Sequence, residues 1–399
     1  MKALDDLFVV DLSRILSGPV CTMLMGDMGA DIVKIEPPPT GDDSRQWGPP
    51  FIGGTSTYFH SINRNKKSLG LNLKADAGRQ ILWKLIERAD VLLENFRPGV
   101  LDKLGFGYKD VSKANPRVVY CSISGFGQTG PYRDRPGYDV IAQGESGVMH
   151  LTGYPNQPPV KMGASLADIV AGLHAFQGIL LALLARHRTG KGQRIDISLL
   201  DSMVSTLTYH ALIYFTTGRS PKRMGNRHPS IVPYECFEAR DGFVNVAVTN
   251  EKQWTNFCKV LGFPNIATDP RFATMKERLA HYDELKAMIV KVLSTWTRAE
   301  VMQRMEEVGI PAGPINTVGE ILEDPHIKAR EMVYELIHPE HGPLRMLGIP
   351  IKLSETPGAI ELAPPRFGQH NREVLTRLGY DERAIHDFSE RGVVSESHA

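Results

Sequence analysis

Short apolar runs alternate with amphipathic stretches along the first half of the chain. The apolar runs predict buried β-strands, and stretches with apolar residues three and four positions apart predict helices. Strands are expected at 7–12, 31–36, 67–73, 90–96, 117–124 and 193–200, and helices at 18–28, 77–89, 100–104, 166–188 and 201–215. Strands that alternate with helices in this way are typical of βαβ units on a parallel sheet, so we predict an α/β fold.

The composition changes between Thr217 and Ser230, where Gly, Arg, Pro and Asn are frequent, and we expect a second domain to begin there. The Gly- and Pro-rich stretch 37–65 is too long for an ordinary connection, so we interpret it as a functional loop. In the second half we expect a hairpin at 234–239 and 243–248, helices near 251–261, 282–295 and 298–308, strands near 333–338 and 344–353, and a helix from Gln369.

The charge balance of the 399-residue chain disfavours a nucleic-acid partner, because 46 Lys and Arg face 45 Asp and Glu and the net charge is +1. The longest unbroken apolar run, 179–185, is far shorter than the ~20 residues of a membrane helix, so no membrane partner is expected. The acidic residues just after Met1 are unlike a signal peptide. The four widely spaced cysteines suit free thiols in a reducing compartment, and we expect a cytoplasmic protein without disulfides or zinc.

Residues 125–130 read Gly-Phe-Gly-Gln-Thr-Gly directly after a predicted strand, which resembles a dinucleotide-binding fingerprint. That motif needs a helix at the pyrophosphate, whereas a Pro-rich turn follows here, so an NAD site is disfavoured. We interpret these glycines instead as a loop that lets another ligand approach the backbone. No metalloprotease or hydrolase motif occurs, and the scattered histidines do not suggest a metal site.

Asp168 stands in the first turn of a long, otherwise apolar predicted helix. An acid at this position can be a capping residue, because the helix dipole favours negative charge there. A carboxylate on a mostly buried helix near glycine-rich loops can also be a desolvated nucleophile. The spacing does not decide between these two interpretations.

Six motifs in fixed order are more specific than any of these patterns. They are Leu-Ser-Arg with Ser-Gly-Pro at 12–19, Gly-Ala-Asp-Ile-Val-Lys-Ile-Glu at 29–36, Asn-Lys-Lys-Ser at 65–68, Glu-Asn-Phe-Arg-Pro-Gly at 94–99, Gly-Phe-Gly at 125–127 and Thr-Gly-Lys-Gly-Gln at 189–193. With these motifs the chain resembles, from about residue 5 to 390, the class III CoA-transferases. That family includes formyl-CoA transferase and the related α-methylacyl-CoA racemases.

The resemblance implies that Asp168 is the catalytic aspartate, which forms an acyl anhydride and then an aspartyl-CoA thioester. It implies no tightly bound cofactor, with coenzyme A and acyl-CoA as substrates and small carboxylic acids as partners. The positions that would contact CoA or its thioester are Leu16, Ser17, Leu71, Asn72, Leu73, Lys74, Asn95, Phe96, Arg97, Lys103, Tyr138 and Asp139. The departures from the family pattern are Pro37, Pro136 and the absence of a consecutive-glycine loop, whose region holds 225–234.

Segments 45–51, 228–234 and 313–316 are most similar to succinate/glutarate (hydroxymethylglutarate) CoA-transferases. We hypothesise that Arg45, Arg227 or His228 pairs with the remote carboxylate of a dicarboxylic acid. Ordinary solvated loops are the alternative explanation for these residues. Racemases carry histidine where this chain has Tyr138, and tyrosine is a poor base near neutral pH, so transferase is preferred to racemase. A non-catalytic CoA-binding protein is a third alternative, which would not need Asp168.

The family also implies an interlocked homodimer, in which each chain is threaded through the other. A Rossmann-like large CoA-binding domain would combine residues 1–220 with a return segment at 331–399, and a smaller α+β domain would occupy 221–330.

Overall fold

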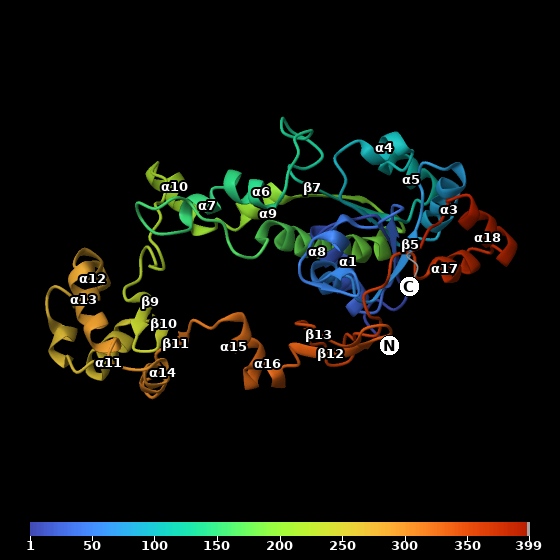
Figure 1. Ribbon diagram of the computed structural model, residues 1–399. Coiled ribbons are helices and arrows are strands. Elements are labelled where there is room, and N and C mark those ends of the chain that lie inside the picture. The colour runs from blue at the N-terminus through green and yellow to red at the C-terminus, as the bar shows by residue number, and fades with distance from the viewer. Residues whose placement is uncertain (397–399) are drawn as a thin grey trace. The chain divides into compact units, whose positions relative to one another are not determined.

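The computed structural model describes residues 1–396, which form two compact units (Figure 1). Unit 1 holds Met1–Val148, Lys161–Leu212 and the described residues from His326 onward. Unit 2 holds Met149–Val160 and Ile213–Pro325. The change of unit therefore lies near both predicted boundaries, but unit 2 also contains 149–160, which the sequence analysis assigned to the large domain.

A six-stranded parallel sheet forms the centre of unit 1, with the order β5-β2-β1-β6-β7-β8. Numbered by their sequence within this sheet, the strands run 3-2-1-4-5-6, the order of Rossmann-like sheets. The α/β prediction is confirmed. The strands are β1 (Phe8–Asp11), β2 (Asp31–Glu36), β5 (Lys66–Gly70), β6 (Val91–Glu94), β7 (Val119–Ser124) and β8 (Arg194–Ser198).

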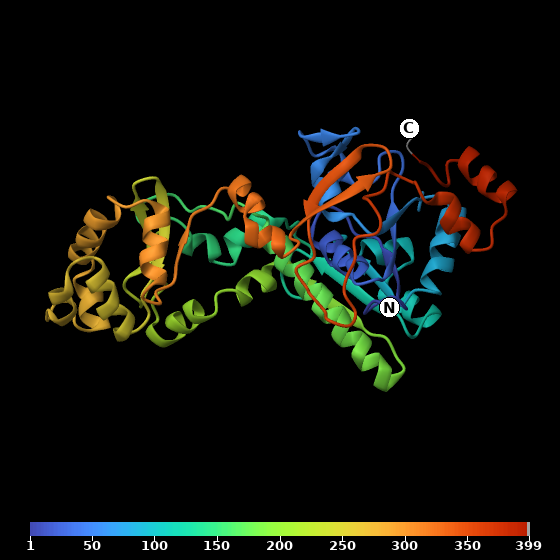
Figure 2. The same ribbon diagram turned by 90° about the horizontal axis from the view of Figure 1, so that it is seen from below.

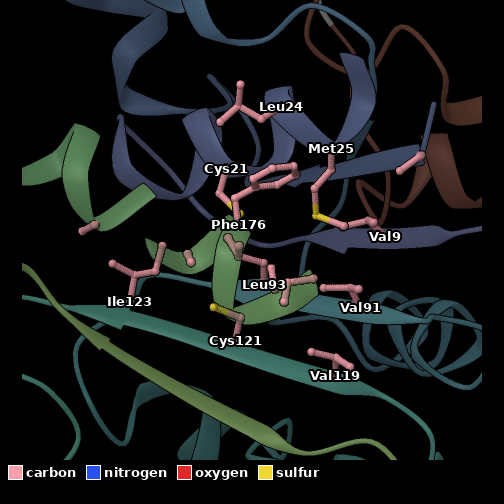
Figure 3. Close-up of a cluster of buried hydrophobic side chains, with 14 of the residues drawn as sticks. Val9, Cys21, Leu24, Met25, Val91, Leu93, Val119, Cys121, Ile123 and Phe176 are labelled. Carbon is pink, nitrogen blue, oxygen red and sulfur yellow. The ribbon is translucent and has the colours of Figure 1, made fainter. Parts of the chain in front are cut away.

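Helices cover both faces of this sheet because successive strand residues point to opposite sides. Val9 joins a core with α1 and α8, where Cys21, Met25 and Phe176 pack together (Figure 3). Val10 joins a second core on the opposite face. The helices of unit 1 include α1 (Ser17–Asp27), α3 (Asp76–Ile86), α4 (Val100–Leu104), α5 (Tyr108–Ala114), α6 (Asp139–Glu145), α8 (Leu166–Thr189) and α9 (Leu199–Ser205).

The C-terminal segment packs onto the second face of the same sheet. The helices α17 (Asn371–Arg377) and α18 (Glu382–Glu390) lie beside α3 in both views (Figures 1 and 2). Asn371 accepts a hydrogen bond from the Gly70 amide at 2.9 Å, and the Ser395 amide donates to the Gly70 carbonyl at 3.0 Å. The hairpin of β12 (Val333–His338) and β13 (Gly342–Leu347) also belongs to unit 1.

The 37–65 stretch has short elements of its own, which are the 3-10 helix Asp43–Gln46, β3 (Phe51–Ile52), β4 (Thr55–Ser56) and α2 (Thr57–Ile62). The carboxyl of Asp42 accepts from the Ser44 amide at 2.9 Å and caps the first of these turns. Buried side chains such as Phe59 and Ile62 fix the stretch to unit 1, so it is an ordered loop.

Unit 2 is an α+β unit around the three-stranded sheet β11-β10-β9. The predicted hairpin is present as antiparallel β9 (Tyr234–Ala239) and β10 (Gly242–Ala247), and β11 (Ala312–Pro314) pairs with β10. Trp254 and Phe257 lie in its core. Its helices include α11 (Glu251–Val260), α12 (Met275–Ala280), α13 (Tyr282–Leu293) and α14 (Arg298–Glu306).

Two predicted helices are broken. The 201–215 helix consists of α9 and α10 (Tyr209–Thr217), with Thr208 at a φ of 41° between them. The helix expected from Gln369 ends at Arg377, and Gly379, at a φ of 88°, separates α17 from α18. A left-handed residue cannot continue a right-handed helix, so the chain turns at both positions.

Among the described residues, α8 alone is a helix long and apolar enough to cross a membrane by length and composition. The helix itself was predicted at 166–188, but the longest unbroken apolar run did not indicate how apolar it is overall, because His174 and Gln177 interrupt the run without making the helix polar. Part of α8 is buried against α1, as expected of a core helix. The absence of a membrane partner stays a prediction.

Candidate active site

A cavity of about 140 Å³ opens at the carboxyl ends of β1, β6 and β7 in unit 1. The strand order changes direction between β1 and β6, and open α/β sheets bind ligands at such points. The cavity is lined by Arg14, Ile15, Ser17, Asn95, Phe96, Arg97, Pro98, Ile123, Ser124, Gly125, Arg135, Pro136, Gly137, Tyr138, Asp168 and Leu199.

Asp168 is the carboxylate of this cavity. It lies in the first turn of α8 and is half-buried. Burial raises the pKa of Asp168 to about 7, and the nearby negative charge of Asp139 contributes to the increase. The Ser17 side chain acts in the opposite direction, because its hydrogen bond favours the ionised carboxylate. The site thus holds a carboxylate that is poorly solvated and partly ionised near neutral pH.

Asp139 supplies the cap for the helix that carries Asp168. Its carboxyl accepts the Ala167 amide at 2.9 Å, whereas the side chain of Ser165, at the N-cap position of α8, makes no capping hydrogen bond. Gln143 donates to both carboxyl oxygens of Asp139, at 3.0 and 2.8 Å. Because this cap comes from Asp139, the capping interpretation of Asp168 is weakened, and its carboxyl is left to face the cavity.

Arginine side chains give the cavity positive charge. The Arg14 guanidinium lies over the Phe96 ring at 5.2 Å and pairs with Asp43 at 3.2 Å. Arg97 forms no ion pair within the described part of the chain. Guanidinium groups bind phosphates through paired hydrogen bonds, so these positions suit a phosphate-bearing ligand. Arg135 also lines the cavity, where it contacts Phe126 and Tyr132 and pairs with Glu145.

The structure brings together about half of the residues expected to contact CoA. Ser17, Asn95, Phe96, Arg97 and Tyr138 line the cavity with Asp168, and Asp139 accepts a hydrogen bond from Ala167, the residue before Asp168. The others are not among the lining residues. Leu16 is buried beside Ser17, and Lys103 lies on α4. The segment Leu71–Lys74 follows β5, and its Leu71 and Asn72 contact the C-terminal segment.

The structure does not support Arg45 as a substrate-binding residue. Its guanidinium is buried and donates to both Glu36 carboxyl oxygens at 2.7 Å, and it also donates to the Pro365 carbonyl at 3.1 Å. The burial of Arg45 over the Phe59 ring, at 3.6 Å, removes it from any ligand. The prediction that Arg45 pairs with a substrate carboxylate is therefore wrong, because Glu36 already neutralises its charge within the fold.

Arg227 and His228 belong to unit 2. The Arg227 guanidinium lies 3.6 Å from the centre of the Tyr282 ring, and its buried Nε has no hydrogen-bond partner. The His228 amide donates to the Tyr234 carbonyl at 3.1 Å. Stacking on an aromatic ring holds a guanidinium while leaving its edge for an anion.

Several residues that line the cavity were not among the predicted site residues. Arg14 and Gly125 belong to the family motifs Leu-Ser-Arg at 12–14 and Gly-Phe-Gly at 125–127, which could have identified them as site residues. Ile15 and Leu199 are apolar and lie in no such motif, so nothing in the sequence points to them. No group of three or more His, Cys, Asp or Glu side chains among residues 1–396 is placed to hold a metal ion. The free thiols of Cys21, Cys121 and Cys258 are buried, and that of Cys236 is half-buried.

Comparison with known proteins identifies the chemistry. Residues 4–371 match CoA-transferase family III. The chain is 41% identical to succinyl-CoA:glutarate CoA-transferase of Mus musculus, over 99% of this chain and 91% of that protein. It is 43% identical to acetyl-CoA:oxalate CoA-transferase of Acetobacter aceti, over 90% of this chain and 92% of that protein.

A solved structure has the same fold. The crystal structure of a CaiB/BaiF family protein from Brucella suis superimposes with a TM-score of 0.85 at 41% identity, and covers 94% of this chain and 99% of that chain. Full-length similarity to named CoA-transferases agrees with a cavity that combines a half-buried carboxylate with arginines. The chain is a CoA-transferase and belongs to CoA-transferase family III.

Proposed function

We propose that this enzyme transfers CoA from succinyl-CoA, or a similar acyl-CoA, to a dicarboxylic acid, with Asp168 as the nucleophile. The observation that carries the proposal is the half-buried Asp168 carboxyl, with a pKa of about 7, in a cavity lined by arginines. A poorly solvated carboxylate attacks a thioester more readily than a hydrated one.

In the first half-reaction, a carboxylate oxygen of Asp168 attacks the thioester carbonyl carbon. The carbon–sulfur bond breaks, CoA leaves as the thiolate with the electron pair, and a mixed anhydride remains. The thiolate then attacks the aspartyl carbonyl of this anhydride, which releases the donor carboxylate and leaves an aspartyl-CoA thioester. The acceptor carboxylate repeats these two steps in reverse order and regenerates Asp168. Exclusion of water protects the anhydride from hydrolysis.

The cavity residues have matching tasks in this proposal. Arg14 and Arg97 hold the phosphates of CoA, and Asn95 and Phe96 line its path. Backbone amides beside Gly125 and Gly137 stabilise the oxyanion that forms when the thioester is attacked. The Leu71–Lys74 segment and Lys103 remain proposed CoA contacts.

For the acceptor we propose a dicarboxylic acid. The named relatives act on glutarate and oxalate. We further propose Arg227 and His228 as ligands of the second carboxylate, since the Arg227 guanidinium pairs with no described carboxylate and rests on Tyr282.

We also propose a cytoplasmic homodimer in which the two chains interlock. Exposed leucines support a partner chain, because Leu181 and Leu184, three positions apart on α8, are 67% and 60% exposed. Large apolar side chains grouped on a surface usually mark an interaction site.

The test is an exchange assay by mass spectrometry, with succinyl-CoA as donor and a panel of di- and monocarboxylic acceptors. Asp168→Ala should abolish the exchange and keep CoA binding, and the wild type without acceptor should accumulate a hydroxylamine-sensitive CoA adduct on the Asp168 peptide. Persistent exchange in Asp168→Ala would refute the mechanism.

The same panel of acceptors tests the proposed ligand of the second carboxylate. Arg227→Gln should lose more activity with diacids than with monoacids, whereas the control Arg240→Gln, at an exposed position, should lose activity with neither. Equal losses with diacids and monoacids in Arg227→Gln would show that Arg227 does not bind the second carboxylate.

A further inference from the structure

The loop between β1 and α1 contains a backbone conformation that its sequence does not favour. Ile15 has a φ of 72°, in the left-handed region. A β-branched residue rarely adopts this conformation, because its side chain collides with the backbone. Such strain persists only where surrounding contacts hold it, and it is common at active sites. Ile15 and Ser17, two residues later, both line the cavity of Asp168.

Side chains bind the backbone of this loop at successive residues. The Ser13 amide donates to Asp11 at 2.8 Å, and its carbonyl accepts from Lys34 at 2.7 Å. The Arg14 backbone amide donates to Asn95 Oδ1 at 2.8 Å, and the Arg14 carbonyl accepts from Asn95 Nδ2 at 2.7 Å. The Ile15 amide donates to both carboxyl oxygens of Asp42 at 3.2 Å.

The central pair of this arrangement is ionic and fully buried. Lys34 Nζ lies 2.8 Å from the Asp42 carboxyl, and neither side chain has any exposed surface. Both ions thus contact the loop as well as each other, Lys34 at Ser13 and Asp42 at Ile15. A buried ion pair gives little net stability, because desolvation offsets most of the attraction. Its contacts with the loop therefore suggest a purpose other than stability.

The turn is also tight on its other side. A Cβ on Gly18 would lie 2.2 Å from the Ser13 Cβ, so the beginning of α1 folds directly back onto the loop. A relaxation of Ile15 to negative φ would redirect the chain at Leu16 and displace Ser17. The Ser17 side chain interacts with the Asp168 carboxyl, so such a displacement changes the surroundings of the nucleophile.

We propose that Lys34 and Asp42 are positioning residues of the active site, which hold Ile15 in its strained conformation and so place Ser17 against Asp168. The inference rests on the proposed role of Asp168 and goes beyond it, since neither Lys34 nor Asp42 lines the cavity. Misplacement of reacting groups by about 1 Å can reduce a rate by roughly a hundredfold.

The first test compares Asp42→Asn with a matched control. Asp42→Asn should lower kcat about tenfold or more, while KM for the acyl-CoA changes less than about twofold. Loss of the Ser17 interaction should also move the acid limb of the pH–rate profile to higher pH. The control, Asp27→Asn, lies at the far end of α1, where Asp27 forms an equally buried pair with Arg64 at 2.7 Å. It should lower stability and leave kcat of the folded enzyme unchanged; equal kcat losses in the two variants would overturn the proposal.

The second test removes the strain itself. Glycine adopts positive φ without the Cβ collision. In the double variant Asp42→Asn/Ile15→Gly the loop therefore has less tendency to relax. Its kcat should be higher than that of Asp42→Asn and close to that of Ile15→Gly alone, which is the reference. No recovery would overturn the assignment of strain.

Ser44→Ala provides a milder perturbation if Asp42→Asn does not fold. It removes the hydroxyl that donates to Asp42 at 2.8 Å and leaves no charge unpaired. It should lower kcat in the same direction by a smaller factor, and wild-type kcat would overturn the proposal. If exchange persists in Asp168→Ala, the proposed function fails; if exchange needs Asp168 but not Asp42, only this inference fails.

Discussion

Two carboxylates at the cavity have different roles although both are acids near the beginning of a helix. Asp139 accepts hydrogen bonds from Ala167 and Gln143, which hold its charge in place. Burial and the neighbouring negative charge of Asp139 raise the pKa of Asp168. The difference in surroundings makes Asp139 the cap of α8 and supports the proposal that Asp168 is the nucleophile.

This pairing predicts a pH dependence of the reaction. The nucleophile must be ionised, so kcat/KM should rise with pH through the Asp168 pKa of about 7. Asp139→Asn keeps an acceptor for Ala167 but removes the negative charge that raises the Asp168 pKa, so the acid limb should move to lower pH. The measurement is the pH profile of kcat/KM, with Asp134→Asn, an exposed acid, as the control. A limb that stays in place or moves upward in Asp139→Asn would contradict the electrostatic explanation.

Single residues also show where sequence reasoning reaches its limit. Asp168 could be singled out by its place on an apolar helix, and its role was suggested by family resemblance. Arg45 looked equally available in the sequence, but its charge is neutralised by Glu36, nine positions earlier and on another element. Whether an arginine is free depends on its partners in three dimensions, which a local pattern does not contain.

At the scale of elements, the site depends on how closely α1 approaches α8. Ser17 begins α1 and Asp168 lies in the first turn of α8, so their separation follows the packing of the two helices. Gly172 lies at this contact, where an added Cβ would be 2.6 Å from the Ser17 carbonyl oxygen.

Gly172→Ala should therefore separate the helices and impair both stability and exchange. Overpacking of this kind costs typically about 1–3 kcal/mol, which exceeds the ~1 kcal/mol by which alanine favours a helix. Denaturant unfolding and the exchange assay measure the two effects. Gly178→Ala on the same helix is the matched control, because its Cβ would meet only the Ile195 side chain at 3.2 Å. Wild-type stability and kcat in Gly172→Ala would show that the contact has no such role.

Most strands of the sheet could be predicted because each is a short apolar run between turn residues. The observed bounds fall within the predicted ones except at β5, which begins one residue earlier, at Lys66. The predictions failed where one residue changes the direction of a helix. Threonine rarely adopts a positive φ, so nothing in the sequence indicates the turn at Thr208, whereas Gly379 is a residue type that often ends a helix. A pattern of apolar positions continues across such a turn, so periodicity alone does not reveal it.

For the whole molecule, the sequence predicts two structural units, but the course of the chain follows from contacts between distant residues. The return of α17 and α18 to the first unit was implied by the family resemblance and not by any pattern in residues 326–396. Unit 2 also includes 149–160, where the Gly225 amide donates to the Gly153 carbonyl at 3.0 Å.

The proposed homodimer predicts a particle of twice 44.3 kDa in light scattering. Leu184 on α8 is 60% exposed, so Leu184→Asp would change the free energy of unfolding of an isolated chain by less than about 0.5 kcal/mol. In a dimer that buries this face, the same change should weaken association and raise the monomer fraction on dilution. Lys109→Asp on the exposed side of α5 serves as the control. A wild-type mass of one chain would contradict the dimer.

The hydrogen bond between Gly70 and Ser395 has a consequence for biosynthesis. The two residues are separated by about 325 positions, so at roughly 5–20 residues per second a ribosome needs about 15–65 s to translate the segment between them. Throughout that interval β5 and the core around Val10 lack Val374, Leu375 and Val394. All of unit 2 is translated before those residues are made, so the core of unit 2 can fold first. During that time part of the apolar surface of unit 1 stays exposed and accessible to chaperones.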